Sequence, residues 1–411
     1  MGNTLSSSPN DSSQPQVSVF RCNERPIVTL LIEPIANTGS TSRVGTKKIL
    51  HVVNGEHYAG AARVQDLLAL ALPKLGYEVS FACVLPDKFP ERRKSQDSPL
   101  YEFPMKNRLD FEPARRIVQL VKDEGFSIIH SHTTRSAMIA SAAARLAGVP
   151  YVHHVHCQMD TEVGQRLQSF VNKSIEKMAC RTADQVIAVS GSIKRFLQDN
   201  RFTRRPIGVV PNGVPQAALQ KTPREDGQPW TIGMVALLRE RKGLETLMHS
   251  LPELQRKHDV RLRIVGPFES EGYRNRMYDL SDSLGITSLI DWTGFASDVN
   301  SEICKMDVLV LPSVLPEGMP MVLLEAMAAG VPIIGSNVDG ISDVIRHRQN
   351  GLLADPGDAS SLTAQLGEML VGNVDWHLMR YECQNEYAQK YSDSAMAVGV
   401  ARIYDQLLNK Q

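Results

Sequence analysis

Apolar runs of strand length alternate with helical stretches along the chain, and the alternation occurs in two separate series. The first series opens with the run Lys47 to Val53, a glycine-containing loop, a helical stretch from Ala61 to Leu75 and a strand from Glu78 to Val84. Strand, helix and strand in that order predict a βαβ unit with parallel strands and a right-handed crossover. The second series runs from Thr231 to Gly335. We therefore expect an α/β protein with two doubly wound, Rossmann-like domains that face each other across a cleft.

Residues 212–228 interrupt the alternation and have the composition of a linker. The predicted organisation is a disordered tail at 1–25, an N-terminal α/β domain at 26–212, a linker at 213–228, a C-terminal α/β domain at 229–390 and, at 391–411, a helix that packs back across the domains. The start of the tail is polar and rich in serine, asparagine and proline, which predicts disorder. Met1-Gly2 with Ser6 also fits the short myristoylation pattern, and the sequence leaves lipidation of Gly2 open.

Charge and cysteine usage exclude several classes of protein. Lysine plus arginine number 45, as do aspartate plus glutamate, so no overall basic field favours a nucleic-acid partner. The six cysteines are scattered without a Cys-x-x-Cys pair, which is typical of reduced thiols in the cytoplasm. The sequence has no run of about 18 apolar residues that would predict a transmembrane helix. Its N-terminus lacks the basic and apolar regions of a secretory signal, so we expect a cytoplasmic protein.

The segment Val308 to Ser336 places two carboxylates around the start of a helix. A strand of buried type leads into a loop constrained by proline and glycine, and Pro320 suits the first turn of a helix that ends at Gly330. The N-terminus of this helix should point into the cleft, where its free N–H groups favour an anion such as a diphosphate. Glu317 lies in the loop before the helix, and Glu325 lies on the helix among apolar residues. From these residues alone, a solvent-facing Glu325 beside a charged loop is favoured over a pair that binds sugar hydroxyls.

The same segment resembles the Glu-x7-Glu signature of the retaining GT-B glycosyltransferases of family 4. It reads Glu317-Gly318 and then, after five residues, Leu324-Glu325-Ala326-Met327-Ala328-Ala329-Gly330-Val331-Pro332. Other segments that resemble the family are Ser127 to His156, Ala183 to Lys194, Val209 to Val214, Gly294 to Val299 and Met306 to Ser313. The resemblance implies that Glu317 contacts the hydroxyls of the donor sugar and that Glu325 binds the nucleotide ribose. Many members have Gly-Phe-Gly after the first glutamate, whereas this chain has Gly318-Met319-Pro320, in which the proline has no N–H to donate.

Basic and small residues complete the implied donor site. Lys242 lies where a strand gives way to a helix, and its charge would neutralise the departing diphosphate. Five positions earlier many relatives have an arginine, but this chain has Leu237; Arg239 is the nearest basic replacement, with a solvated charge run as its alternative. Gly60 lies in a loop whose small residues permit close backbone approach. The donor-binding residues that the resemblance implies are Gly60, Arg239, Lys242, Phe295, Met319, Met321, Val322 and Glu325.

Two histidine pairs allow more than one interpretation. His130 and His132, like His154 and His156, are two residues apart on predicted strands, so each pair shares a face. Such pairs could hold a metal ion, although hydrogen-bonded histidines at strand ends are commoner. The resemblance favours His156 as a histidine near the donor sugar. No Asp-x-Asp follows an apolar strand, so we predict no metal and no cofactor, with Glu317 and His156 as the catalytic residues.

The resemblance implies a retaining glycosyltransferase that moves a sugar from a nucleoside diphosphate, UDP or GDP, to a hydroxyl of a glycan or lipid-linked acceptor, as in polysaccharide biosynthesis. The N-terminal domain would bind the acceptor and the C-terminal domain the nucleotide sugar. Basic side chains on the stretches Pro113 to Lys122 and Arg166 to Arg181 could meet an anionic membrane at its cytoplasmic face, although a solvated helix face is commoner. The alternatives are a nucleotide-sugar epimerase or hydrolase of the same fold, a metal-dependent hydrolase built on the histidine pairs, and a non-catalytic carbohydrate-binding relative.

Overall fold

The computed structural model describes residues 46–108, 110–158, 166–225 and 227–409. The predicted tail at 1–25, and with it Gly2, lies outside the described residues, as do residues 26–45 of the predicted N-terminal domain and residue 226 of the predicted linker. The described residues belong to one compact unit.

The first half of this unit contains a seven-stranded parallel sheet with the strand order β3-β2-β1-β4-β5-β6-β7. Its strands are β1 (Lys47–Val53), β2 (Tyr77–Cys83), β3 (Leu100–Glu102), β4 (Ile128–Ser131), β5 (Tyr151–Val155), β6 (Gln185–Ala188) and β7 (Ile207–Val209). Its helices are α1 (Ala61–Ala71), α2 (Lys88–Arg92), α3 (Glu112–Glu124), α4 (Thr134–Ala147), α5 (Arg166–Thr182) and α6 (Gly191–Asp199). The central strands are buried along nearly their whole length, as expected for a parallel sheet covered by helices on both faces.

The second half contains a six-stranded parallel sheet with the strand order β10-β9-β8-β11-β12-β13. Its strands are β8 (Trp230–Val235), β9 (Val260–Val265), β10 (Ile290–Gly294), β11 (Val308–Leu311), β12 (Ile333–Ser336) and β13 (Leu352–Ala354). The helices of this half and of the C-terminus are α7 (Leu244–Leu254), α8 (Glu271–Ser283), α9 (Val299–Cys304), α10 (Met321–Ala329), α11 (Ala359–Leu370), α12 (Trp376–Glu386) and α13 (Asp393–Leu408). The predicted α/β class with two doubly wound parallel sheets is confirmed.

Each sheet reverses its strand order once, between β1 and β4 in the first and between β8 and β11 in the second. In open α/β sheets, ligands bind beyond the carboxyl ends of the strands at such a point. The loops after β1 and β4, and those after β8 and β11, are therefore where a functional site is expected. The catalytic and donor-binding candidates other than His156 and Phe295 follow β1, β8 or β11 or lie on the helix that comes next.

Local chemistry explains where helices depart from their predicted bounds. The helical stretch predicted to reach Leu75 ends as an α-helix at Ala71, because Pro73 has no N–H for continued α-helical pairing, and a 3₁₀ turn carries on to Leu75. The helix predicted to begin at Pro320 begins at Met321, with Pro320 in the extended conformation of an N-cap.

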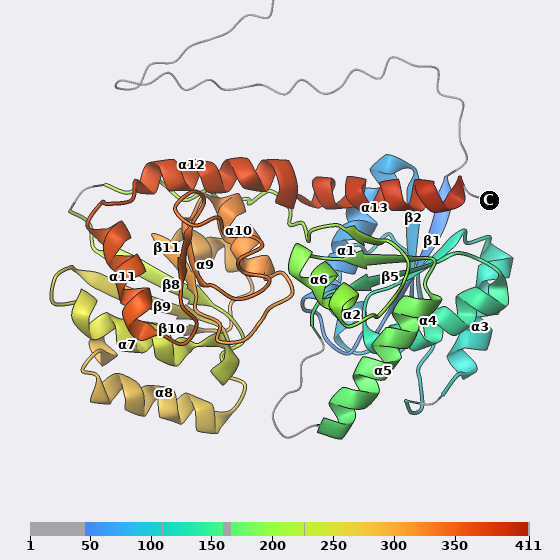
Figure 1. Cartoon of the computed structure of the whole chain (residues 1–411), viewed down its shortest axis with the longest axis horizontal. Coiled ribbons are helices and arrows are strands. Elements are labelled where there is room, and N and C mark those ends of the chain that lie inside the picture. Colours follow the sequence, from blue (N-terminus) through green and yellow to red (C-terminus); the bar gives the residue numbers. More distant parts are fainter. Residues whose placement is uncertain (1–45, 109, 159–165, 226, 410–411) are drawn as a thin grey trace, which may run out of the picture. The chain divides into compact units, whose positions relative to one another are not determined.

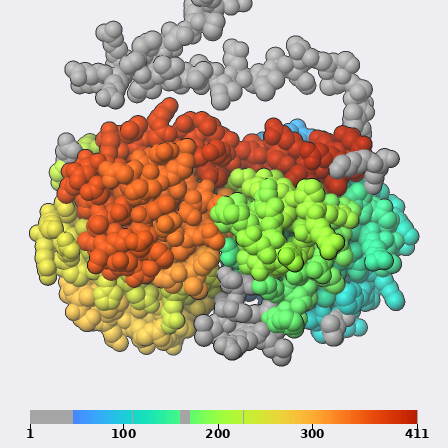
Figure 2. All heavy atoms as spheres, in the orientation of Figure 1, coloured from blue at the N-terminus to red at the C-terminus, as the bar shows by residue number. Residues whose placement is uncertain are grey.

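The last two helices lie against different halves of the unit (Figure 1). Helix α12 packs against α10, whereas α13 packs against α1. Tyr404 on α13 is fully buried, and its hydroxyl forms hydrogen bonds with His51 Nε2 at 3.1 Å and His130 Nδ1 at 2.6 Å. In the space-filling view, the red atoms of the C-terminal helices adjoin both halves (Figure 2). The C-terminal helices thus contact both halves of the unit, α12 the second half and α13 the first.

Candidate functional site

Helix α10 is apolar nearly all round, with Glu325 as its only charged residue. Strand β11 ends at Leu311, and the loop that follows leads to this helix. The helix ends at Gly330, whose φ of 71° is the left-handed conformation that suits glycine. The residues of α10 are buried except for Val322 and Glu325, which are partly exposed. Burying a carboxylate on such a helix costs free energy unless a hydrogen-bond donor is bound to it. The group that is bound to Glu325 therefore indicates what this position can bind.

Glu317 is held at the start of α10 by a cation and a hydroxyl. Its Oε1 accepts a hydrogen bond from Lys242 Nζ at 2.6 Å and another from Ser313 Oγ at 2.9 Å. Lys242 belongs to the short 3₁₀ turn Glu240–Lys242 that follows β8, and the adjacent Arg241 donates to the carbonyl of Pro316 at 2.7 Å. The loops after β8 and β11 are therefore tied together, with a lysine and a glutamate side by side at the helix N-terminus.

Glu325 has a partner from the other half of the unit. Its Oε1 forms an ion pair with Nη2 of Arg63, which lies in the first turn of α1. The Glu325 side chain is only 18% exposed, so it does not face solvent as the simpler interpretation required. Arg63 was not among the predicted site residues, and 262 positions of sequence separate it from Glu325.

Backbone atoms of the two halves meet at Gly318. A Cβ atom built on Gly318 would lie 1.6 Å from the carbonyl oxygen of His156 and 2.8 Å from its carbonyl carbon. Nearby, Gln158 Nε2 donates to Asp339 Oδ2 at 2.9 Å. The loop before α10 is thus in direct contact with the residues that follow β5, and only a residue without a side chain permits so close an approach.

Other predicted donor residues lie farther from this centre. Arg239 is paired with Glu269, with 3.4 Å between Nη1 and Oε1, and Leu237 is 45% exposed. Met319 and Met321 are buried, and the Met319 carbonyl accepts a hydrogen bond from Asn212 Nδ2 at 3.1 Å. The Met319 sulfur accepts a hydrogen bond from the Asn212 N–H at 3.2 Å, so the side chain and the carbonyl are both held by Asn212, which leaves the backbone N–H as the part that could meet a ligand.

A cavity of about 600 Å³ lies between the two halves, beside α10. Glu325, Arg63 and the 68% exposed Phe295 line it, together with Arg92 and Lys94 from the first half. Gly60, with φ 44°, precedes α1 and so leads directly into the turn that carries Arg63. Arg63, Arg92 and Lys94 were missed because nothing in the spacing of the sequence indicates which basic residues of the first half face the second.

Family models match the chain in two consecutive parts. Glycosyltransferase Family 4 matches residues 58–217, and Glycosyl transferases group 1 matches residues 216–390. Together they span every strand of the two sheets except β1, and every catalytic and donor-binding candidate named above. The chain belongs to glycosyltransferase family 4.

Relatives and solved structures agree with this assignment. Phosphatidyl-myo-inositol mannosyltransferase of Mycobacterium leprae is 28% identical over 72% of this chain and 79% of its own length. The Escherichia coli UDP-Gal:alpha-D-GlcNAc-diphosphoundecaprenol alpha-1,3-galactosyltransferase is 25% identical over 73% of this chain and 81% of its own length. HepE of Anabaena, solved with UDP, superposes with a TM-score of 0.76 at 20% identity, covering 88% of this chain and 100% of that one. The last comparison supports the GT-B fold, and the predicted glycosyltransferase class is confirmed.

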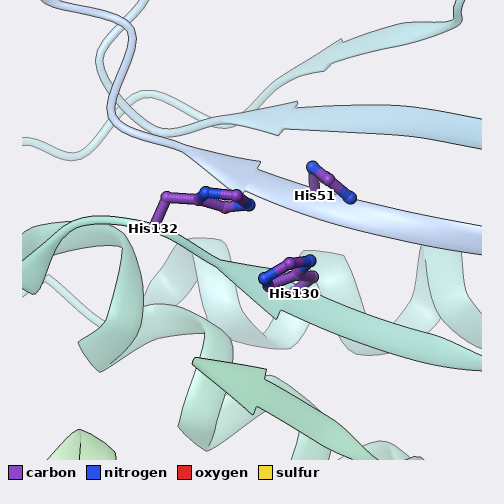
Figure 3. Close-up of side chains that lie close together, drawn as sticks. All are labelled: His51, His130 and His132. Atoms are coloured by element: carbon purple, nitrogen blue, oxygen red, sulfur yellow. The ribbon is translucent and has the colours of Figure 1, made fainter. Parts of the chain in front are cut away.

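The glycosyltransferase contains a row of neighbouring histidines, His51, His130, His132 and His156, which we call the histidine column. His51, His130 and His132 come together from β1 and the end of β4 (Figure 3), and the rings of His130 and His132 lie 4.2 Å apart. His132 Nδ1 is hydrogen-bonded to His156 Nε2 at 2.9 Å, which extends the column to the residue that contacts Gly318.

Nitrogens of His51, His130 and His132 all lie within 4.8 Å of one another, a donor set that a transition metal could bind. A catalytic metal also needs a position open to substrate, whereas these three side chains are buried. The absence of a metal requirement stays a prediction.

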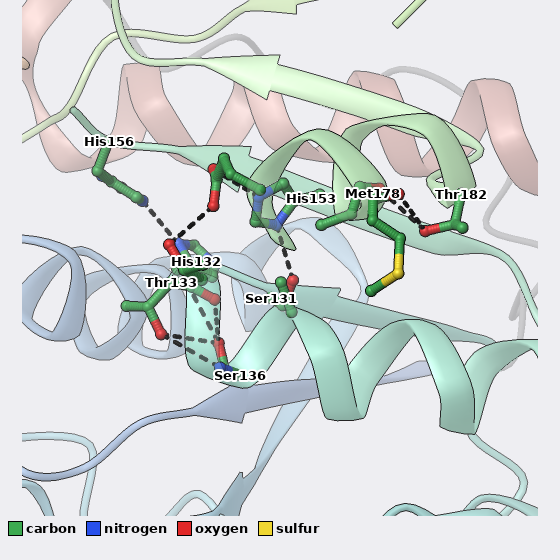
Figure 4. A network of polar contacts seen from close by, with 12 residues as sticks. Ser131, His132, Thr133, Ser136, His153, His156, Met178 and Thr182 are labelled. Atoms are coloured by element: carbon green, nitrogen blue, oxygen red, sulfur yellow. Dashed lines mark hydrogen bonds and ion pairs between the residues drawn. The ribbon is translucent and has the colours of Figure 1, made fainter. Parts of the chain in front are cut away.

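A second polar network lies beside this column in the glycosyltransferase (Figure 4). His153 is hydrogen-bonded to Ser131 Oγ at 2.9 Å through Nδ1 and to Glu176 Oε1 at 2.9 Å through Nε2. Thr134 Oγ1 donates to the other carboxylate oxygen of Glu176 at 2.9 Å. Burial alone would raise the pKa of Glu176, but the neighbouring His153 and these hydrogen bonds outweigh it and lower that pKa. This network is internally satisfied and anchors α5 to β5.

The histidine column should make the glycosyltransferase sensitive to acid. Burial lowers the pKa of His51 to about 3, and burial together with neighbouring histidines lowers the pKa values of His130, His132 and His154. Below pH 6.5 the unfolded chain therefore binds more protons than the folded one, so stability is fully present above pH 6.5 and is lost as the pH falls toward 3. One such histidine costs about 2 kcal/mol at pH 5.

We expect His51→Gln to reduce this acid sensitivity, because glutamine keeps an amide donor for Tyr404 and cannot be protonated. The measurement is Tm from pH 8 to pH 5 for the wild-type protein, for His51→Gln and for a control, His57→Asn, on an exposed loop residue. The wild-type and control curves should fall together with acid, and His51→Gln should fall less. Three curves of the same slope would contradict the prediction.

No helix in the described part of the glycosyltransferase is long and apolar enough to cross a membrane. The predicted location in the cytoplasm stays a prediction, as does membrane contact through α3 and α5. On α5, Phe170, Val171 and Met178 are exposed apolar side chains.

Proposed function

We propose that this glycosyltransferase transfers a sugar from a nucleoside diphosphate, UDP or GDP, to a hydroxyl of a glycan or lipid-linked acceptor and retains the anomeric configuration. The observation that carries the proposal is the arrangement around α10. Lys242 and Glu317 lie together at the N-terminus of this helix, and Glu325 lies one turn farther along it, in the cavity between the two halves. The Lys242 ammonium and the helix N-terminus suit the diphosphate of the donor. Glu317 suits its sugar, and Glu325 suits its ribose.

The reaction exchanges one bond at the anomeric carbon for another. The bond between this carbon and the diphosphate oxygen breaks, and its electron pair leaves with the diphosphate. The acceptor hydroxyl oxygen bonds to the same face of the carbon, and its proton passes to the departing phosphate oxygen. Positive charge on the sugar and negative charge on the diphosphate both increase in the transition state, so groups that stabilise these charges accelerate the transfer.

Each half of the site has a proposed part in this step. Lys242 and the free N–H groups of α10 stabilise the departing diphosphate, since a helix N-terminus and an ammonium both favour negative charge. The Glu317 carboxylate accepts hydrogen bonds from the sugar hydroxyls and holds the anomeric carbon in line. His156, whose pKa burial lowers to about 3, is neutral at physiological pH, and its imidazole serves as a hydrogen-bonding group rather than a cation.

The names of related proteins support the donor and acceptor classes. The Escherichia coli relative uses UDP-Gal and a diphosphoundecaprenol acceptor, and the mycobacterial relative acts on phosphatidyl-myo-inositol. HepE has been solved with UDP-glucose. These proteins favour a nucleotide-sugar donor and an acceptor that carries a lipid.

A binding and turnover screen tests the proposal. UDP, GDP, ADP and their hexose conjugates should raise Tm selectively for one base, because a ligand at a hundred times its Kd stabilises the folded state by about 2.7 kcal/mol. Incubation of the selected sugar nucleotide with the enzyme alone, and then with lipid-linked acceptors, should give product only in the second case. Stabilisation by none of these ligands would overturn the proposal, and full turnover of donor without an acceptor would favour an epimerase or a hydrolase.

A further inference from the structure

The two carboxylates on and before α10 are paired with cations from different halves of the chain. Lys242, which pairs with Glu317, comes from the same half as that glutamate, whereas Arg63, which pairs with Glu325, comes from α1 of the other half. Arg63 and Glu325 line the same cavity of about 600 Å³. The two ion pairs therefore respond differently to a ligand that enters between the halves.

A ribose that binds Glu325 from the cavity competes with the Arg63 guanidinium for the carboxylate. Under the proposed function, ribose hydroxyls donate hydrogen bonds to this carboxylate, whose Oε1 is bound to Arg63. An arginine stays protonated in proteins, so Arg63 keeps its full charge when it leaves the carboxylate. A guanidinium inside a partly closed cavity is costly unless another anion is within reach.

The donor diphosphate is such an anion. Lys242 is already shared with Glu317. Three cations of the first half line the cavity, namely Arg63, Arg92 and Lys94, and of these Arg63 is the one that is ion-paired with a side chain of α10. Glu325 lies four residues from Met321 at the start of α10, which is about 6 Å of helix rise. A rotation of the Arg63 side chain spans that distance, and its planar fork can bind two phosphate oxygens at once.

We infer that Arg63 exchanges partners, pairing with Glu325 in this structure and with the diphosphate of the bound donor. The inference rests on the proposed function, because it requires a nucleoside diphosphate in the cavity. Arg63 also links the halves in this role, since the other diphosphate-binding groups belong to the second half. Release of the diphosphate after transfer returns Arg63 to Glu325.

Separate binding measurements with a nucleoside and its diphosphate test the exchange. For Arg63→Gln, Kd for UDP, or for GDP if the screen selects guanosine, should rise about 10- to 100-fold, the loss expected for a charge-assisted contact. Kd for uridine or guanosine should stay the same or fall, because Glu325 no longer has a competing cation. Arg63→Lys should recover part of the diphosphate affinity. Arg116→Gln is the matched control, an ion-paired arginine on α3 of the same half.

Three results would overturn the inference. An equal gain in affinity for nucleoside and diphosphate in Arg63→Gln would mean that Arg63 only blocks Glu325. An equal loss for both would mean that Arg63 supports the fold of the site and does not exchange partners. No change in either Kd would mean that Arg63 does not meet the donor. If the wild-type protein binds neither UDP nor GDP, the proposed function itself fails, which distinguishes that failure from the others.

Discussion

Replacement of Glu317 by glutamine is expected to lower kcat for sugar transfer by about 10²- to 10³-fold while the protein stays folded. Glutamine has nearly the same shape but carries no charge, so it holds the sugar less strongly and does not counter the positive charge that develops on it. The carboxylate is oriented by Lys242 at 2.6 Å and Ser313 at 2.9 Å, and a precisely placed acceptor of this kind contributes most in the transition state. Steady-state kinetics with the donor that the screen selects would measure the effect.

The same variant separates a role in catalysis from a role in binding or stability. Glu317→Gln leaves Lys242 without its anionic partner, so the affinity for UDP or GDP should be unchanged or higher even though turnover is lost. Glu253→Gln is the control, because Glu253 is also paired with a lysine, Lys257, but on the surface of α7. Turnover of Glu317→Gln at the wild-type rate would remove Glu317 from the mechanism, and an equal loss in both variants would point to a general effect of charge.

The alternation of strands and helices predicted most of the fold because it depends on local physics. Buried parallel strands need short apolar runs, and the predicted strand Lys47 to Val53 coincides with β1. Strands β3 and β13, by contrast, have three residues each, and neither was predicted. So short a segment at or near the edge of a sheet has no periodicity of its own, and pairing with its neighbour decides its conformation.

The sequence predicted which site residues come together within one half of the chain, but not which residues of the two halves contact each other. Lys242 and Glu317 follow β8 and β11, which are adjacent strands, so parallel pairing brings their loops together. Arg63 and Glu325 belong to different sheets, and no rule of spacing or period relates them. Tyr404 is a similar case, because its hydrogen bonds to His51 and His130 depend on where the C-terminal helix returns.

The contact between Gly318 and His156 yields the other prediction with a large expected effect. Gly318→Ala should lower kcat by at least about 10²-fold, because the added methyl group cannot fit against the His156 carbonyl and the groups at the two sides of the site are held apart. The clash is with backbone atoms at 1.6 and 2.8 Å, which cannot be relieved by rotation of a side chain. A displacement of about 1 Å at a reacting centre is enough to cost a factor of this size.

Gly272→Ala provides the control, since a Cβ at this position on α8 meets nothing within 4 Å and alanine favours a helix. Small-angle scattering should give a larger radius of gyration for Gly318→Ala than for Gly272→Ala in the presence of UDP or GDP, and kinetics should show the loss of turnover in the first variant alone. Because Glu325 lies in the second half, the affinity for uridine or guanosine should fall far less than kcat. A Gly318→Ala enzyme with full turnover would mean that transfer does not require this contact. A parallel loss of nucleoside affinity and kcat would mean that the alanine disturbs the donor loop itself rather than the approach of the two halves.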